Sequence, residues 1–120
     1  MLDSGRAGMT EKRVAMKQYK VMFDALEWQS PIHGARFKVF RSGTMQLRLV
    51  EFTNEFVEPD WCEKGHIGFV LQGELEIDFR GSVVRYPQGS GVFIPSGSAT
   101  AHKGRSLTPT VLLFLVEEIN

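Results

Sequence analysis

Apolar and polar residues alternate in short runs along the chain after Pro31, and glycine separates most of these runs. The clearest run, residues 74–79, alternates an acidic side chain with Leu, Ile or Phe. A period of two is that of a β-strand with one buried and one wet face. Runs of similar texture cover residues 35–41, 45–52, 66–72, 82–86, 91–95 and 110–118. The pattern predicts many short strands.

Glycine-containing turns connect consecutive runs. Ser42-Gly43 separates the first two runs and is a hairpin signal, and Gln72-Gly73 joins the next two. The last run, residues 110–118, is apolar on both faces, which predicts a central strand covered on both sides. Many short strands with glycine turns and no interleaved helices predict an all-β sandwich or small barrel.

Good helix formers are confined to the first quarter of the chain. Residues 10–18 and 23–28 contain them, but with only short apolar patterns. Residues 1–9 are typical of a loose leader, within which Met9 is an alternative start to Met1. We therefore expect a leader with a short helical or irregular segment over residues 1–30, and a single β-domain over residues 31–120.

Composition narrows the classes of function. The 120 residues suffice for one core, and 42% apolar with 23% charged residues is an ordinary globular balance. A formal net charge of zero argues against nucleic acid and anionic membranes as partners, and it favours self-association, so a homodimer is expected. The longest apolar run, residues 111–116, is too short to span a membrane, and the start resembles no signal peptide, so the expected location is cytoplasmic.

The stretch "DWCEKGH", residues 60–66, concentrates candidate chemistry. On a strand, Asp60 and Cys62 would point to the same face, and His66 follows a change of direction that Gly65 permits. Cys62 is the only cysteine, so it is a buried thiol, a metal ligand or a reactive group. Near Lys64 and His66 a metal-free Cys62 could also be a redox-sensitive thiol.

Two longer stretches carry a resemblance to a known family. "GHIGFVLQGELEIDF", then "YPQGSGVFIPSG" and "AHKG", are similar to the cupins, over roughly residues 35–117. The most specific parts are the strand-turn-strand around Gly73 and the step formed by Gly89, Pro95 and Gly97. The variant "WCEKGH" resembles a small bacterial subgroup with a Trp-Cys signature. The resemblance implies a double-stranded β-helix, or jelly-roll barrel, and a metal bound by the first and second motifs.

The ligand positions that the resemblance implies are rewritten in this chain. Counting back from Gly73, the glutamate of the first cupin motif falls on His66 and its two histidines fall on Cys62 and Asp60. The histidine of the second motif corresponds to His102, which lies two residues further from Gly97 than the motif places it. The leading glycine and closing asparagine of the motifs are replaced by Asn54 and Ser106. Each of the four candidate ligands can nevertheless bind a metal.

A thiolate, imidazole and carboxylate set favours zinc or iron over magnesium or calcium, with nickel, copper and manganese left open. Gln72 shares the side of His66 on its strand, where Gly68 is expected to leave space for a metal. Arg48 and Gln46 share the opposite face from Met45; a solvated outer sheet is the simpler interpretation. If that face instead lines the barrel, the two could orient a polar or anionic ligand. The predicted pocket residues are Gln72 and, if its face lines the barrel, Arg48.

Three functions follow from these observations. The first is a metal-dependent cupin acting on a small organic molecule, for which the resemblance implies dioxygenase- or isomerase-like chemistry without assigning a reaction. The second is a non-catalytic module that binds a ligand or metal, as a sensor or store. The third is a degenerate barrel with an empty apolar pocket. Metal with an open position favours the first, fully coordinated metal the second, and failure to bind metal the third.

Overall fold

The structure, a computed structural model, describes Met16, Lys17 and residues 19–119. Within these residues it contains short strands and two 3₁₀ turns. Their bounds are β1 (Met16–Lys17), β2 (Lys20–Val21), η1 (Phe23–Ala25), β3 (Gln29–Ile32), β4 (Ala35–Ser42), β5 (Met45–Thr53), β6 (His66–Gln72), β7 (Leu75–Asp78), β8 (Val83–Tyr86), β9 (Gly91–Ile94), η2 (Ser98–Thr100), β10 (Lys103–Ser106) and β11 (Thr110–Glu118). The strands expected from the alternating runs are all present.

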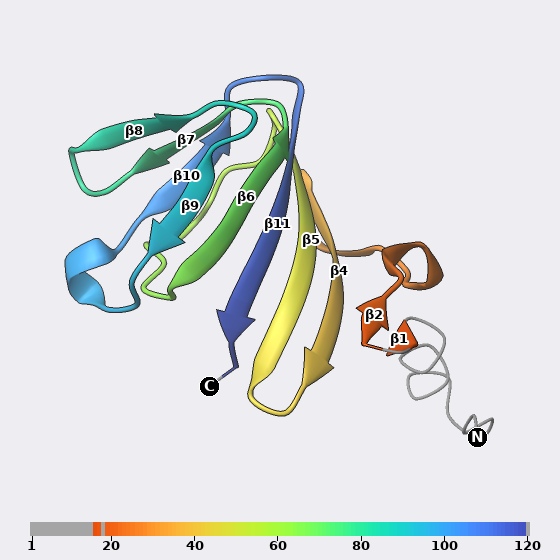
Figure 1. The fold of residues 1–120 in the computed structure, drawn as a ribbon. Helices are drawn as coiled ribbons and strands as arrows, with labels where there is room; N and C mark the ends of the chain where they lie inside the picture. Colours follow the sequence, from red (N-terminus) through yellow and green to blue (C-terminus); the bar gives the residue numbers. More distant parts are fainter. Residues whose placement is uncertain (1–15, 18, 120) are drawn as a thin grey trace.

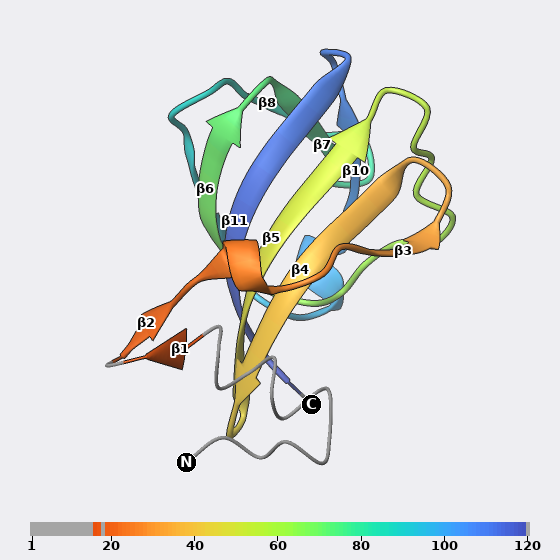
Figure 2. The same cartoon turned by 90° about the vertical axis from the view of Figure 1, so that its right-hand side faces the viewer.

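The strands form two larger antiparallel sheets that lie opposite each other (Figures 1 and 2). One sheet has six strands in the order β3-β4-β5-β11-β6-β9, and the other has three in the order β10-β7-β8. The β4–β5 hairpin turns at Gly43, whose φ of 60° suits glycine. At Gly73 (φ 81°) the chain leaves the larger sheet at β6 and enters the smaller one at β7.

The core lies between the inner faces of these two sheets. The smaller sheet contributes Leu75 and Ile77, which alternate with the less buried Glu76 and Asp78, as expected for a half-buried strand. The larger sheet contributes buried residues from four of its strands: Val50, Val70, Val92, Ile94, Val111, Leu113 and Leu115. Two sheet faces joined by one apolar layer form a β-sandwich, and this layer fixes the segments that carry Cys62, His66 and His102.

Strand β11 is central, as its composition predicts, but its two faces are covered unequally. Val111, Leu113 and Leu115 are buried on the inner face, whereas Phe114 on the outer face is half-buried. The ring of Phe114 meets Phe23 of η1 edge to face, with centroids 6.3 Å apart. The N-terminal segment therefore supplies part of the outer cover, which a central strand of a sandwich otherwise lacks.

The N-terminal segment differs from the expected helices. Met16–Lys17 forms a strand, and the helical expectation for residues 23–28 reduces to the single 3₁₀ turn η1. Leu26 follows this turn and packs against Phe40 of β4, so tertiary contact rather than helix propensity fixes the segment. The expectations for residues 1–9, and for residues 10–15 and 18, lie outside the described residues. No helix in the described part of the chain is long and apolar enough to cross a membrane.

Gly68 has a packing role that the sequence analysis misassigned. A Cβ at this position would overlap the carbonyl oxygen of Phe114 on the neighbouring β11 and approach Leu115 Cδ2 to 2.9 Å. The expectation that Gly68 leaves space for a metal is therefore wrong. The backbone of β11 fills that space.

Candidate metal centre

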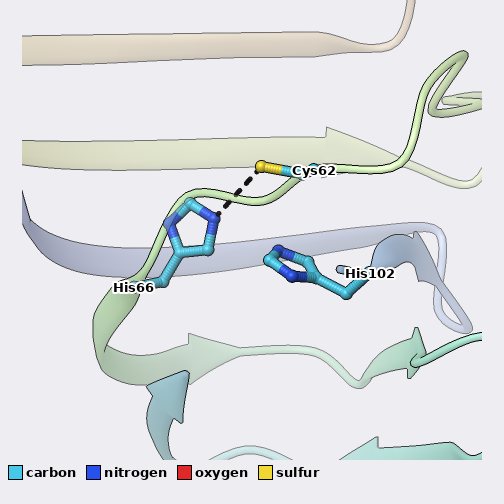
Figure 3. Close-up of side chains that lie close together, drawn as sticks. All are labelled: Cys62, His66 and His102. Atoms are coloured by element: carbon cyan, nitrogen blue, oxygen red, sulfur yellow. Dashed lines mark hydrogen bonds between the residues drawn. The ribbon is translucent and has the colours of Figure 1, made fainter. Parts of the chain in front are cut away.

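Three side chains from separate segments converge at one place (Figure 3). Cys62 lies between β5 and β6, His66 is the first residue of β6, and His102 precedes β10. One donor atom from each, the sulfur of Cys62 and a ring nitrogen of each histidine, lies within 4.8 Å of the other two. Cys62 Sγ is 3.8 Å from His66 Nε2, and the rings of His66 and His102 meet edge to face at 5.1 Å.

A backbone bridge brings His102 to Cys62 across 40 residues of chain. The Cys62 N–H donates to the His102 carbonyl at 2.9 Å, and the His102 N–H donates to the Cys62 carbonyl at 3.0 Å. The Gly97 N–H also donates to the Glu63 carbonyl at 2.8 Å. Gly65 permits this docking by its small size, because a Cβ there would lie 2.9 Å from the Ile94 carbonyl oxygen. These contacts fix a convergence that sequence alone could not place.

Hydrogen bonds at the Nδ1 atoms fix how the two imidazoles are presented. His66 Nδ1 lies 2.6 Å from Glu117 Oε2, and His102 Nδ1 lies 2.9 Å from the Thr100 carbonyl oxygen. An ionised carboxylate and a carbonyl can only accept, so each Nδ1 carries its proton and donates. Each ring therefore keeps its Nε2 as the nitrogen that can bind a metal.

The three side chains shift one another's protonation. Interactions with His102 first, and then with His66, outweigh burial and lower the pKa of Cys62 from 9.0 to about 6. Burial opposes protonation of His66, but interactions with Cys62 and Glu117 outweigh it and raise its pKa from 6.5 to about 9. The pKa of His102 is also raised, because Cys62 and the Thr100 carbonyl outweigh the opposing effect of burial. Neutral pH therefore favours a thiolate beside a protonated imidazole.

The cluster lies in the wall of a cavity of about 350 Å³, a size that suits a small organic molecule. Most of the wall is apolar. Its aromatic part consists of Phe37, Phe52 and Phe56, of which the last two stack with centroids 4.5 Å apart. Polar groups lie on the same wall, among them Arg48 and Glu58. The cavity thus presents three metal-binding donors and a few polar groups to an otherwise apolar space.

The structure brings together three of the four predicted ligands. Asp60 is exposed in a bend rather than on a strand, so the expected shared face with Cys62 does not form, and it lies outside the converging group. Arg48 lines the cavity, which corrects the interpretation of its face as a solvated outer sheet. Gln72, the other predicted pocket residue, is exposed at the end of β6 and is not part of the cavity wall.

Sequence reasoning missed Glu117. Its side chain is only 6% exposed and contacts His66 and Arg48. The signal was present in the sequence: residue 117 continues the alternation of Val111, Leu113 and Leu115, so it falls on the buried face of β11. A carboxylate in register with a buried face needs a partner, and His66 and Arg48 supply it.

Comparison with known proteins identifies the fold. No protein-family model matches the chain, and no curated protein matches it. Solved structures do match. KdgF from Halomonas sp. is 25% identical, with a TM-score of 0.67 over 81% of this chain and 91% of that one. An RmlC-like cupin from Shewanella frigidimarina is 12% identical, with a TM-score of 0.65 over 81% and 86% of the two chains.

FeII HppE matches at 14% identity, with a TM-score of 0.65 over 80% of this chain and 57% of that one. Together with the two facing sheets, these matches show that the chain folds as a small cupin domain with a jelly-roll architecture, as the sequence motifs predict. The Trp-Cys subgroup, the homodimer and the cytoplasmic location stay predictions.

Proposed function

We propose that this cupin domain binds one divalent transition metal ion, zinc or iron, through Cys62, His66 and His102, and that a small organic molecule occupies the adjoining cavity beside it. The observation that carries the proposal is the convergence of three soft or borderline donors, within 4.8 Å of one another, on the wall of a cavity. FeII HppE, whose structure shares this fold, contains iron(II). Zinc and iron both accept thiolate and imidazole ligands.

The donor geometry fits such an ion. Zinc bound at about 2.3 Å from sulfur and about 2.0 Å from nitrogen holds its tetrahedral donors about 3.5 Å apart. Cys62 Sγ and His66 Nε2 are already 3.8 Å apart. The widest pair in the cluster, within 4.8 Å, needs to close by at most about 1.5 Å, which side-chain rotation can supply.

Three protein donors beside a cavity leave a coordination position for a bound molecule, which is the arrangement of catalytic rather than structural metal sites. A metal held there would act as a Lewis acid toward an oxygen of that molecule. The chain's own residues would hold and orient it: most of the wall is apolar, and Arg48, which is ion-paired with Glu117, lines the cavity beside the cluster. The reaction is left unassigned, and a non-catalytic binding module is the alternative if the ion proves fully coordinated.

The direct test is the metal content of protein purified without an affinity tag or chelator. We expect close to one zinc or iron ion per chain by inductively coupled plasma mass spectrometry, lost on dialysis against a chelator and regained on anaerobic reloading. The cavity's open position should then allow a small anion such as azide to perturb the spectrum of a cobalt-substituted sample. Protein that is metal-free and takes up none of zinc, iron, nickel, copper or manganese would exclude the proposal.

Metal affinity should rise with pH. Between pH 6 and pH 9 Cys62 is a thiolate while His66 carries a proton on Nε2, and the metal must displace that proton. Displacing this proton makes the association constant rise at least about tenfold per pH unit, and more steeply where His102, whose pKa is also raised, is protonated as well. The affinity should level off once both imidazoles are neutral, and its slope should be steepest below pH 6, where the thiol proton is also lost. Calorimetry in two buffers of different ionisation enthalpy counts the released protons. An affinity that does not change between pH 6 and pH 9 would contradict this assignment.

A further inference from the structure

Glu117 is a carboxylate buried on the inner face of β11, in line with Val111, Leu113 and Leu115. Its side chain is 6% exposed. Burying a carboxylate is strongly unfavourable unless charged or hydrogen-bonding partners compensate. The partners of this buried carboxylate therefore indicate its role.

Each carboxylate oxygen of Glu117 accepts two hydrogen bonds. Oε1 accepts from Gln46 Nε2 at 2.8 Å and from Arg48 Nε at 2.6 Å. Oε2 accepts from Arg48 Nη2 at 2.8 Å and from His66 Nδ1 at 2.6 Å. The sheet order produces this arrangement, because β11 runs between β5, which carries Gln46 and Arg48, and β6, which begins at His66.

We propose that Glu117 is a positioning residue, which fixes the ring orientation and the Nδ1–H tautomer of His66 so that Nε2 faces Cys62 and His102. Arg48 in turn fixes Glu117 through two parallel hydrogen bonds. The inference rests on the proposed metal site. Carboxylates that accept from the far nitrogen of a metal-bound histidine both orient the ring and strengthen its donation to the metal.

The two histidines differ in this respect. The Nδ1–H of His102 donates to a backbone carbonyl of the neighbouring Thr100, which no side-chain substitution removes. The Nδ1–H of His66 depends on a side chain 51 positions away in sequence. Removing the charge of residue 117 should therefore disturb one ligand and leave the other in place.

Glu117→Gln tests the inference, because glutamine has nearly the same size but no charge. We expect the zinc and cobalt affinities, measured by chelator competition, to fall about 10- to 100-fold. The matched control is Glu76→Gln, which removes a carboxylate that is 14% exposed and paired with Arg105 at 2.7 Å on the smaller sheet. Its metal affinity should stay within about threefold of the wild type, since the ion pairs of Glu76, with Arg105 and Arg85, involve none of Cys62, His66 and His102.

A second readout separates positioning from general loosening. In zinc-loaded protein labelled with ¹⁵N-histidine, Glu117→Gln should move the Nδ1 proton and ring nitrogen resonances of His66 and leave those of His102 in place. If the single variant does not fold, because Arg48 loses its partner, Arg48→Met/Glu117→Gln removes both partners and is measured instead. Wild-type affinity in either variant, with resonances of both histidines unmoved or moved alike, overturns the positioning role and leaves the metal site intact. A wild-type protein that binds no metal overturns the metal site itself.

Discussion

His66→Ala and His102→Ala should each lower the affinity for zinc by at least about 100-fold, so that neither variant retains metal through purification. Each substitution deletes one of three protein donors and leaves two, which cannot enclose the ion. Chelator competition gives the affinity, and metal content per chain gives the retention. Cobalt offers a further measurement: in both variants the sulfur-to-cobalt charge-transfer band, which reports Cys62, should weaken as cobalt binding is lost.

His33→Ala is the control for these two variants. The His33 side chain is 80% exposed and pairs with Glu55 at 2.9 Å, outside the cavity wall. Its removal takes away a histidine without touching the cluster, so metal content and affinity should equal those of the wild type. Equal metal loss in His33→Ala, or full retention in His66→Ala, would show that the metal is bound elsewhere.

Much of the β-architecture can be predicted from local patterns. The alternation in residues 74–79 predicts β7, whose Leu75 and Ile77 are buried, and the apolar run 110–118 predicts the central β11. These predictions succeed because a strand's period of two and its flanking glycines are short-range properties. Helix propensity in the first quarter fails for the opposite reason: Leu26 and its neighbours are fixed by packing on Phe40, a contact that the local sequence does not encode.

The residues of the site likewise differ in whether short-range sequence is enough to predict them. Cys62 and His66 are four residues apart and can be paired from the sequence, and the cupin-like register adds His102. Asp60 lies outside this group because the segment around Pro59 bends instead of forming the regular strand that would place it on one face with Cys62. Gln72 lies outside the cavity wall because it is at the far end of β6 from His66, so sharing a side of the strand does not bring it to the cavity.

Glu117 and Arg48 show what a strand-by-strand analysis leaves out. Glu117 can be assigned to the buried face of its strand from the alternation, whereas the run around Arg48 leaves its face open. Their contact depends on β5 and β11 being neighbours in the sheet, although the two residues are 69 positions apart in sequence. The register that pairs Leu115 with Arg48 and Glu117 with Gln46 is a property of the assembled sheet. The alternation predicts that the carboxylate of Glu117 is buried, but it does not identify Arg48 as its partner.

Gly68→Ala should be the most destabilising of the substitutions considered, even though it adds one methyl group. The new Cβ would overlap the Phe114 carbonyl oxygen, which belongs to the backbone and cannot move away without separating β6 from β11. We expect a loss of about 3 kcal/mol in the free energy of unfolding. This corresponds to a fall in Tm of roughly 10 to 20 °C in a chain of this size. Differential scanning calorimetry and urea unfolding measure both.

Gly91→Ala provides the matched control, on the neighbouring strand β9. Gly91 is also a strand glycine without a positive φ, but the nearest atom to a Cβ there, the Gly68 carbonyl oxygen, is 4.0 Å away. Alanine fits this space and restricts the unfolded chain, so its stability should lie within about 0.5 kcal/mol of the wild type or slightly above it. If both variants unfold at the same temperature, the close approach at Gly68 is not what fixes β6 against β11. If only Gly68→Ala is destabilised, the absent side chain is what allows β6 to bring His66 to the Glu117 end of β11.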